Sequence, residues 1–554
     1  MKIRRNESTP AWRSQVTSPV FIGGCLIPAV VIAADVMLHS QTSALLSRVG
    51  NFSMAKFNHW IIWSVSLFLV YCAAIAVIPA LGKQKLGVSS DRPEFSYFSW
   101  FCMIFGAGLG VGMLTWGVTE PISGMKNNPD VVRGITDSVS DNNFSSALKW
   151  SYIHWGLSAW ACYAVVGLAI AYTGYRQKLP LTFSASLVPL FGESMRGKSG
   201  AFVDMCAVGA TILCIIQTLG YALEETVICF AQTTGVMWLM SDDGSATIGG
   251  KLGASTLIVA LGAASAMSGI HKGVKWLSNV NVLVSLCALA IILVAGSFKD
   301  GVFMLISSIF GYLTSLPEIM FSVWSKDETD IGNALQEWQG TWSVFHWSWW
   351  IAFAPFVGVF LAKISKGRTV REYLAMTVVL PALFCMVWMT IAGGNALLLE
   401  LHGDANGAIF EAVTGQKIFV MVQHLFNSQW IGFLVSCVLV VLLVTYLATS
   451  IDSALVVIKT LTNQDVSSKS SSKSSSSQGA ILVWAVMLAI VMGVMVLSSG
   501  FYSVRAVMVV AAVPISVMIT LLAVSVSVAM YKESYKRTDG VVNQISEFGF
   551  SSGR

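Results

Sequence analysis

The chain has 554 residues, of which 55% are apolar and only 11% are charged, and its mean hydropathy is +0.70. Soluble domains are about 45–50% apolar and about 25% charged, so this composition excludes an ordinary soluble enzyme, a disordered protein and a nucleic-acid-binding protein. We therefore predict an all-α polytopic membrane protein that lies in a lipid bilayer. The net charge of +5 requires no anionic partner, because basic residues gather in short loops on one side of the predicted membrane.

Apolar runs long enough to cross a membrane, about 20 residues each, recur along nearly the whole chain. We predict twelve transmembrane helices. They lie near residues 19–39, 59–82, 97–120, 147–172, 202–222, 254–269, 278–297, 337–363, 373–399, 429–458, 479–499 and 503–530. We interpret the first as a retained anchor rather than a signal peptide.

The distribution of Lys and Arg predicts the orientation of these helices. With the N-terminus inside, the inner segments hold 24 of the 34 basic residues, so we expect both termini in the cytoplasm. The predicted parts are a cytoplasmic N-tail, two N-terminal helices with a loop, two five-helix sets separated by an outer interfacial helix and turn, and a cytoplasmic C-tail. They cover residues 1–18, 19–96, 97–299, 300–336, 337–530 and 531–554. Near the outer end of the fifth helix, we expect Glu224 and Glu225 to be solvated.

The third predicted helix contains four glycines at every second position, from Gly106 to Gly112. Each costs roughly 1 kcal/mol of helix propensity relative to Ala, so we expect a break that exposes backbone atoms. Irregular backbone at membrane depth is tolerated where protein or a water-filled cavity surrounds it, and transport is a common reason to build one. A small-residue packing face is the alternative interpretation of this spacing.

Aromatic residues form stripes on the fourth and eighth helices. On the eighth, five rings lie within about 80° of one another: Trp338, Trp342, Phe345, Trp349 and Phe353. On the fourth, Tyr152, Trp155, Trp160 and Tyr163 span about 140°. Aromatic faces at membrane depth suit a cation that cannot donate hydrogen bonds, such as a quaternary ammonium or a tertiary sulfonium. Packing or contact with lipid is an alternative role for these rings.

The run WSVFHWSWW from Trp342 to Trp350 continues through residues 354–358 and 364–372 and resembles the signature of the betaine/choline/carnitine transporter (BCCT) family. Supporting matches are the glycine run with Glu120-Pro121, the segment His154-Trp155-Gly156, and residues 449–453. The resemblance covers nearly the whole chain. It implies a LeuT-type 5+5 inverted repeat preceded by two additional helices, and it suggests a homotrimer. Because the glycine run and the Trp349–Pro355 region open the first helix of each repeat, we expect both of these helices to be interrupted.

The resemblance also implies which residues bind the substrate. They are the aromatic residues Trp155, Trp160, Tyr163, Trp349, Trp350 and Phe353, with the backbone of Gly108, Gly110 and Gly112. Trp342 and Phe345 are implied as pathway or gate residues. Phe353 stands where the family often has Trp, and Thr115 stands where it has Phe. These two departures reduce the aromatic surface and leave the choice of onium substrate open.

Sodium is the coupling ion that the resemblance implies, and we expect no other cofactor. The matching sodium site consists of Gly106, Leu109, Tyr446, Thr449 and Ser450. A second sodium site is only partly present, because Thr211 and Phe356 match but Ile215 replaces a hydroxyl. Proton-coupled choline members tend to carry Asp at the position of Gly112, which favours sodium. Hydrogen bonds of Thr449 and Ser450 to their own helix are the alternative interpretation of these hydroxyls.

The sequence thus predicts a secondary transporter of the bacterial cytoplasmic membrane that imports a glycine betaine-like compatible solute with sodium. Proton-coupled choline uptake, ion-independent exchange of carnitine-type compounds and dimethylsulfoniopropionate uptake remain alternatives. An enzyme is disfavoured, because the seven histidines are scattered and no recognisable nucleophile–base spacing occurs.

Overall fold

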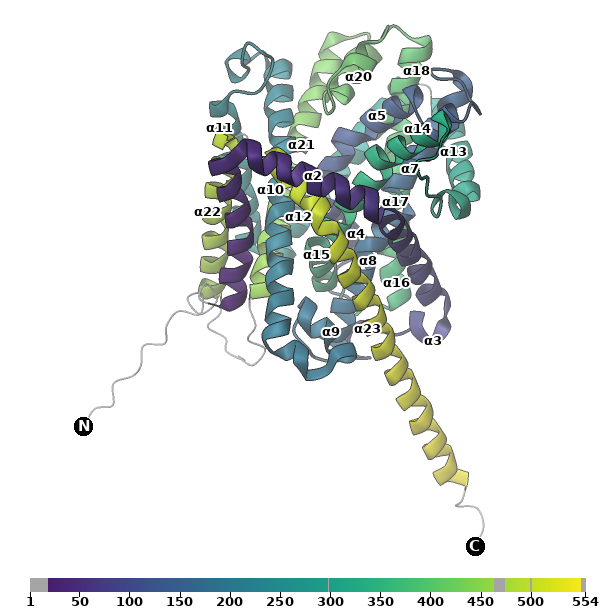
Figure 1. Ribbon diagram of the computed structural model, residues 1–554, viewed down its shortest axis with the longest axis vertical. Helices are drawn as coiled ribbons and strands as arrows, with labels where there is room; N and C mark the ends of the chain where they lie inside the picture. Colours follow the sequence, from purple (N-terminus) through teal and green to yellow (C-terminus); the bar gives the residue numbers. More distant parts are fainter. Residues whose placement is uncertain (1–17, 297, 463–473, 499–500, 550–554) are drawn as a thin grey trace, which may run out of the picture.

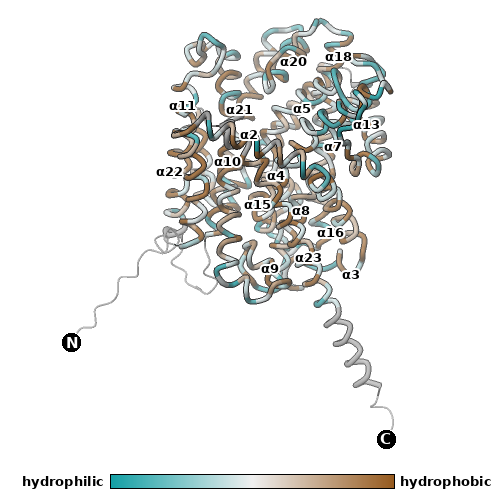
Figure 2. The backbone as a smooth tube through the Cα atoms, in the orientation of Figure 1, coloured by the Kyte–Doolittle hydropathy of each residue, from teal (hydrophilic) through white to brown (hydrophobic). Residues whose placement is uncertain are grey.

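The computed structural model describes residues 18–296, 298–462, 474–498 and 501–549. These residues are almost entirely helical, which confirms the predicted all-α class (Figure 1). Hydrophobic residues predominate in the middle of the molecule, and hydrophilic loops gather at its two ends (Figure 2). The predicted N-tail lies outside the described residues, apart from Ser18.

The two N-terminal spans belong to one long helix, α2 (Pro19–Val77), which bends at Leu38. The bend has non-helical dihedral angles, φ −137° and ψ 42°. The segment between the two predicted spans, residues 39–58, is helical as well, and the non-helical loop follows at residues 83–96. Figure 1 shows this helix, in purple, rising along one side of the molecule, crossing its face and descending to α3 (Pro79–Gly82).

The predicted break in the third span is confirmed. It separates α4 (Tyr97–Gly108) from α5 (Gly110–Lys126) at Leu109, whose φ is −160° and ψ −3°. The two parts are bent by 68°. The glycines on either side allow this geometry, since a glycine-rich segment has little helix propensity to lose.

The fourth span is also broken, which the sequence analysis did not predict. It consists of α7 (Phe144–Trp155) and α8 (Leu157–Ala171), with Gly156 between them at φ −91° and ψ −146°. The break places Trp155 at the end of one helix and Trp160 in the first turn of the next. A π-helical turn, η2 (Tyr172–Arg176), ends the span.

The remaining helices of the first five-helix set follow without a break of this kind. They are α10 (Lys198–Thr234), α11 (Ile248–Ser268) and α12 (Lys275–Ala295). The shorter elements around them are α6 (Pro129–Val132), η1 (Asp141–Asn143), α9 (Phe183–Phe191), η3 (Gly192–Arg196), η4 (Met237–Leu239) and η5 (Ile270–Val274). The predicted helix between the two sets is α13 (Phe298–Ile319), whose segment 301–319 is apolar and long enough to cross a membrane. Its interfacial position stays a prediction.

The eighth span starts with α14 (Asp330–Gln339), passes through a π-helical turn, η6 (Gly340–Val344), and continues as α15 (Phe345–Ile364). The predicted interruption at Trp349–Pro355 is wrong, because α15 is continuous through Pro355. Neighbouring helices can replace hydrogen bonds that a proline removes. Cys214 of α10 packs against this part of α15, with its thiol 3.1 Å from the carbonyl oxygen of Ala352.

The second set also contains five long helical segments. After the eighth span they are 370–402, α21 (Gln429–Thr462), α22 (Ser474–Ser498) and α23 (Phe501–Gly549). Segment 370–402 consists of α16 (Val370–Leu374), η7 (Ala375–Val379), α17 (Leu380–Trp388), η8 (Met389–Gly393) and α18 (Gly394–His402), and the loop after it holds α19 (Ala408–Glu411) and α20 (Lys417–Leu425). The element order therefore fits the predicted two-plus-five-plus-five arrangement. In Figure 1 the start of α2 and the end of α23 lie at the same end of the molecule.

Candidate functional site

The alternating glycines let aromatic rings lie directly against the broken helix. A Cβ built on Gly108 would lie 2.9 Å from the ring of Trp160, and one on Gly112 would lie 3.3 Å from the ring of Trp155. On Gly110 it would lie 1.9 Å from the ring of Tyr446. The glycines therefore allow aromatic rings to approach the backbone closely, in addition to allowing the helix to break. Close packing, the alternative interpretation of this spacing, thus applies to this segment as well.

The aromatic residues predicted to bind the substrate form one buried group, here called the aromatic box: Trp155, Trp160, Tyr163 and Trp350. The ring centroids of Tyr163 and Trp350 are 4.9 Å apart, and those of Trp160 and Trp350 are 5.5 Å apart. Trp155 meets Trp350 edge to face at 5.9 Å. These distances are ring-to-ring contacts, so the rings must separate for a methylated head group to lie between them.

Trp349 and Phe353 lie beside the aromatic box on α15, with ring centroids 6.0 Å apart. Together with the broken helix they line a cavity of about 30 Å³. It is lined by Ala107, Gly108, Leu109, Val111, Gly112, Ile215, Thr218, Leu219, Trp349, Phe353, Phe356 and Ser450. This cavity brings together predicted substrate residues and predicted sodium residues around the same backbone break. A larger cavity of about 230 Å³ lies between α2 and the α14–η6 turn, away from these residues.

The predicted pathway residues lie beyond the cavity. The ring of Trp342 stacks on His346 at 6.0 Å and meets Trp116 of α5 edge to face at 6.4 Å. Phe345 contacts Trp349 at 6.1 Å. Trp116 also contacts Trp349, so it connects the pathway residues with the cavity wall. The sequence analysis did not single out Trp116.

The residues of the predicted sodium site meet where α4, α12 and α21 pack together. The methyl group of Thr449 lies 3.0 Å from a Cβ built on Gly106, and Ser450 reaches the cavity beside Leu109. Thr449 and Ser450 donate hydrogen bonds to the carbonyls four residues earlier, at 2.8 and 3.2 Å, as the alternative interpretation predicts. A hydroxyl that donates its proton in this way still has lone pairs to offer a cation.

Two polar residues of α12 that the sequence analysis missed extend this group. Asn281 donates a hydrogen bond of 2.8 Å to the hydroxyl of Thr449. Ser278 is fully buried, and its hydroxyl has no hydrogen-bond partner among the described residues. It lies 3.4 Å from a Cβ built on Gly106. Since buried polar atoms are rarely left unsatisfied, this oxygen suits a hard monovalent cation that the neighbouring hydroxyls and carbonyls would share.

The two residues of the partial second sodium site have different surroundings. Phe356 lines the cavity together with Ile215. The hydroxyl of Thr211 donates to the carbonyl of Ala207 at 2.8 Å and is not part of the cavity wall.

Glu225 of α10 is buried, which corrects the expectation that it is solvated. Its carboxylate accepts a hydrogen bond from Thr115 of α5, with oxygen–oxygen distances of 2.9 and 3.2 Å. It also lies against the backbone of Gly415. Its neighbour Glu224 is more exposed and faces Lys251 at 3.9 Å. Hydropathy along the chain does not reveal this difference, because it depends on the packing of α10 against α5.

A residue outside the two five-helix sets provides a hydrogen-bond acceptor for a backbone amide at the break at Gly156. The backbone amide of Leu157 donates to the hydroxyl of Tyr312 on α13, at 3.3 Å. Tyr312 is fully buried, and its ring meets Tyr152 edge to face at 6.0 Å. A lone tyrosine in an apolar run gives no sequence signal for this contact.

Comparison with known proteins identifies the family of this chain. A family model described as "BCCT, betaine/carnitine/choline family transporter" matches residues 19–535. The chain belongs to the BCCT family. It is therefore a multi-pass membrane transporter of the betaine/choline type and not an enzyme.

Among the relatives of this BCCT protein, two have names that state a transported compound. It is 30% identical to the glycine betaine transporter OpuD of Bacillus subtilis, over 93% of this chain and 95% of the relative. It is 28% identical to the osmo-dependent choline transporter BetT2 of Acinetobacter baylyi, over 96% of this chain and 74% of the relative. An uncharacterized transporter of Haemophilus influenzae is 30% identical, over 92% of this chain and 72% of the relative.

Proposed function

We propose that this transporter imports a quaternary-ammonium or sulfonium compatible solute, such as glycine betaine, by symport with sodium. The observation that carries the proposal is the aromatic box, whose four rings lie beside a locally unwound helix. Each desolvated cation–π contact contributes up to about 2 kcal/mol. Three or four such contacts offset part of the cost of removing water from the head group.

The sodium part of the proposal rests on the oxygens at the break. Ser278 places a buried hydroxyl near Gly106, and Ser450 lines the cavity together with Leu109. The hydroxyl of the neighbouring Thr449 accepts from Asn281, and oxygen ligands of this kind suit a hard cation. One sodium ion moving down about 150 mV releases roughly 3.5 kcal/mol, which supports about 300-fold accumulation of a neutral zwitterion.

A second candidate substrate is a choline-type cation without a carboxylate. The buried side chain of Glu225 favours it, because this acid is hydrogen-bonded to Thr115, one helical turn beyond Val111 of the cavity wall. In its ionised form it would attract a positive substrate and repel the carboxylate of a zwitterion.

Uptake into proteoliposomes tests the proposal. We would measure accumulation of glycine betaine, choline, carnitine and dimethylsulfoniopropionate with a sodium, potassium or proton gradient imposed in turn. Sodium-dependent accumulation of one of these compounds is expected. Uptake that needs only internal substrate would indicate an exchanger, and uptake driven by a pH step alone would indicate proton coupling. Transport of none of them would overturn the substrate class.

A further inference from the structure

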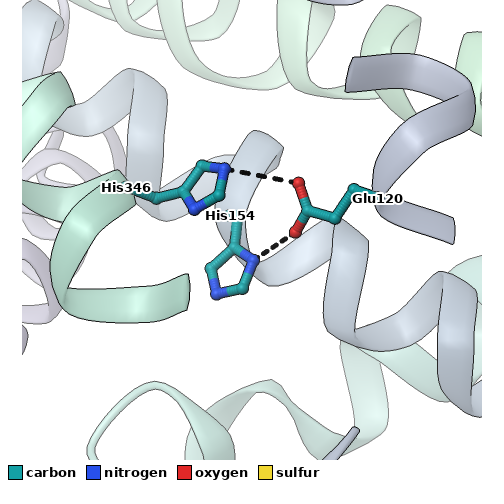
Figure 3. A group of neighbouring side chains, drawn as sticks. All are labelled: Glu120, His154 and His346. Atoms are coloured by element: carbon teal, nitrogen blue, oxygen red, sulfur yellow. Dashed lines mark hydrogen bonds and ion pairs between the residues drawn. The ribbon is translucent and has the colours of Figure 1, made fainter. Parts of the chain in front are cut away.

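Three titratable side chains form a buried cluster where α5, α7 and α15 meet: Glu120, His154 and His346 (Figure 3). At most 4% of each side chain is exposed. Nε2 of His346 lies 3.4 Å from Oε2 of Glu120, and Nδ1 of His154 is hydrogen-bonded to Oε1 of the same carboxyl group. Figure 3 shows both rings facing the carboxyl group of Glu120.

Hydrogen bonding determines where one proton of the cluster lies. Nδ1 of His346 is 2.8 Å from the carbonyl oxygen of Trp342. A carbonyl oxygen only accepts, so this nitrogen carries a hydrogen. If the ring is neutral, Nε2 then presents a lone pair to a carboxylate oxygen of Glu120. The lone pair and the carboxylate oxygen repel each other. A proton on Nε2 of His346 or on the carboxylate oxygen of Glu120 replaces this repulsion with attraction.

The charge of the cluster favours one bound proton. With Glu120 ionised and both rings neutral, the cluster carries one buried negative charge, and one proton cancels it. A second proton on the histidines would place positive charge on two imidazoles whose centroids are 4.6 Å apart and whose planes differ by 7°. Repulsion between the stacked rings opposes this state.

The surroundings supply polar partners and aromatic rings. Ser343 lies 2.9 Å from Nε2 of His154, and rings of neighbouring residues contact the histidines. These rings belong to Trp116, Trp155, Trp338, Trp342, Phe345 and Trp347.

Charged groups on the same and adjoining elements are engaged elsewhere. Lys149 of α7 pairs with Asp130, and Glu225 of α10 bonds to Thr115. Lys417 of α20 donates to the carbonyls of Ile409 and Phe410, and Glu400 of α18 accepts from backbone amides.

The remaining charged side chains on α5 and α14 are Lys126, Asp330 and Glu337. The phenol of Tyr152 on α7 is hydrogen-bonded to Thr390.

Trp155 connects the cluster with the aromatic box. Its indole nitrogen donates a hydrogen bond to Oε2 of Glu120, while its ring meets Trp350 at 5.9 Å and lies against Gly112. A positive head group on this ring would therefore lie one side chain away from Glu120. Its charge would lower the affinity of the cluster for a proton.

We propose that Glu120, His154 and His346 together bind one exchangeable proton, and that an onium substrate entering the aromatic box displaces it. The proposal rests on the proposed substrate class. Because linkage is reciprocal, a substrate that releases a proton binds more tightly as pH rises. Glu120 and the two histidines are positioning residues, since they act on the substrate through Trp155.

Calorimetry on the purified full chain in lipid nanodiscs, at saturating sodium, tests the proposal. Titrating glycine betaine and choline in phosphate and in Tris buffer gives the number of protons released per substrate bound. We expect release of up to one proton and binding that is about tenfold tighter at pH 8.5 than at pH 5.5. An affinity that is flat with pH, without proton release, would overturn the proposal and leave the proposed function intact. Absence of binding by any onium compound would instead overturn the proposed function.

Variants identify the groups that hold the proton. Glu120→Gln and His346→Gln are each expected to abolish proton release while substrate still binds. His402→Gln is the matched control, because this histidine is exposed and pairs with Asp141. Loss of release in the control as well would contradict the assignment. The same holds if Zn²⁺ alone binds the unmodified chain at one site per chain and His346→Gln removes that site, since the cluster would then be a metal site.

Discussion

The ring of Tyr446 lies directly against the backbone of Gly110, so closely that a Cβ built there would come within 1.9 Å of the ring. This contact joins α21 to the start of α5 at the break in the third span. Both residues are buried, so an added side chain at Gly110 would have to displace a buried ring.

Gly110→Ala is expected to abolish transport and to lower the melting temperature of the protein. Overpacking of a filled core typically costs 1–3 kcal/mol. Gly253→Ala is the control, since nothing lies within 4 Å of a Cβ built on this glycine of α11. That substitution should leave transport unchanged and stabilise the helix by up to about 1 kcal/mol. Normal transport by Gly110→Ala would show that the contact is not maintained in the membrane.

Trp160→Leu and Trp350→Leu should each weaken binding of the onium substrate by up to about 30-fold, because each removes one cation–π contact of up to about 2 kcal/mol. Isothermal calorimetry measures the dissociation constant. Trp238→Leu is the matched control, as this indole is 74% exposed. If the box variants and the control bound the substrate with equal affinity, the aromatic box would not be part of the substrate-binding site.

Ser278→Ala is expected to raise the sodium concentration needed for half-maximal uptake, by about tenfold, while uptake at saturating sodium changes little. The reason is that its buried hydroxyl has no other partner in the part of the chain that the structure describes and would be a ligand of the ion. Ser151→Ala serves as the control, because the buried hydroxyl of Ser151 donates to its own helix at 2.8 Å. An unchanged sodium dependence in Ser278→Ala would place the ion elsewhere.

Glu225→Gln should reduce choline uptake more than glycine betaine uptake, by about tenfold in the ratio of the two, since it removes a buried acid that attracts a cation when ionised. Glu224→Gln differs by one position and changes an exposed carboxylate, so it should leave the ratio unchanged. Competition between labelled choline and unlabelled glycine betaine measures the ratio directly. A parallel loss of both substrates would show that Glu225 acts on folding or gating rather than on selectivity.

Most of the fold could be predicted from the sequence, because each span is an apolar run and the break at Leu109 follows from four closely spaced glycines. The break at Gly156 could not, since one glycine in an apolar helix is equally compatible with packing. The break predicted at Trp349–Pro355 was wrong because a proline inside a buried helix need not interrupt it.

The candidate site was predicted only in part. Residues of the aromatic box came from the family resemblance, and the structure brings their rings together. Ser278 and Asn281 were missed, and Glu225 was wrongly expected to be solvated, because the surroundings of each depend on which helix it faces. The three-dimensional packing determines which helix each residue faces. The spacing of residues within a single apolar helix does not.

The contact between Tyr312 and the amide of Leu157 joins a peripheral helix to the point where the fourth span changes direction. Trp155 precedes this point and Trp160 follows it, so the two indoles belong to separate rigid segments. Rotation at Gly156 would move one indole relative to the other without melting either helix. A displacement of α13 would therefore act on this junction through Tyr312, and with it on the separation of the two indoles of the aromatic box.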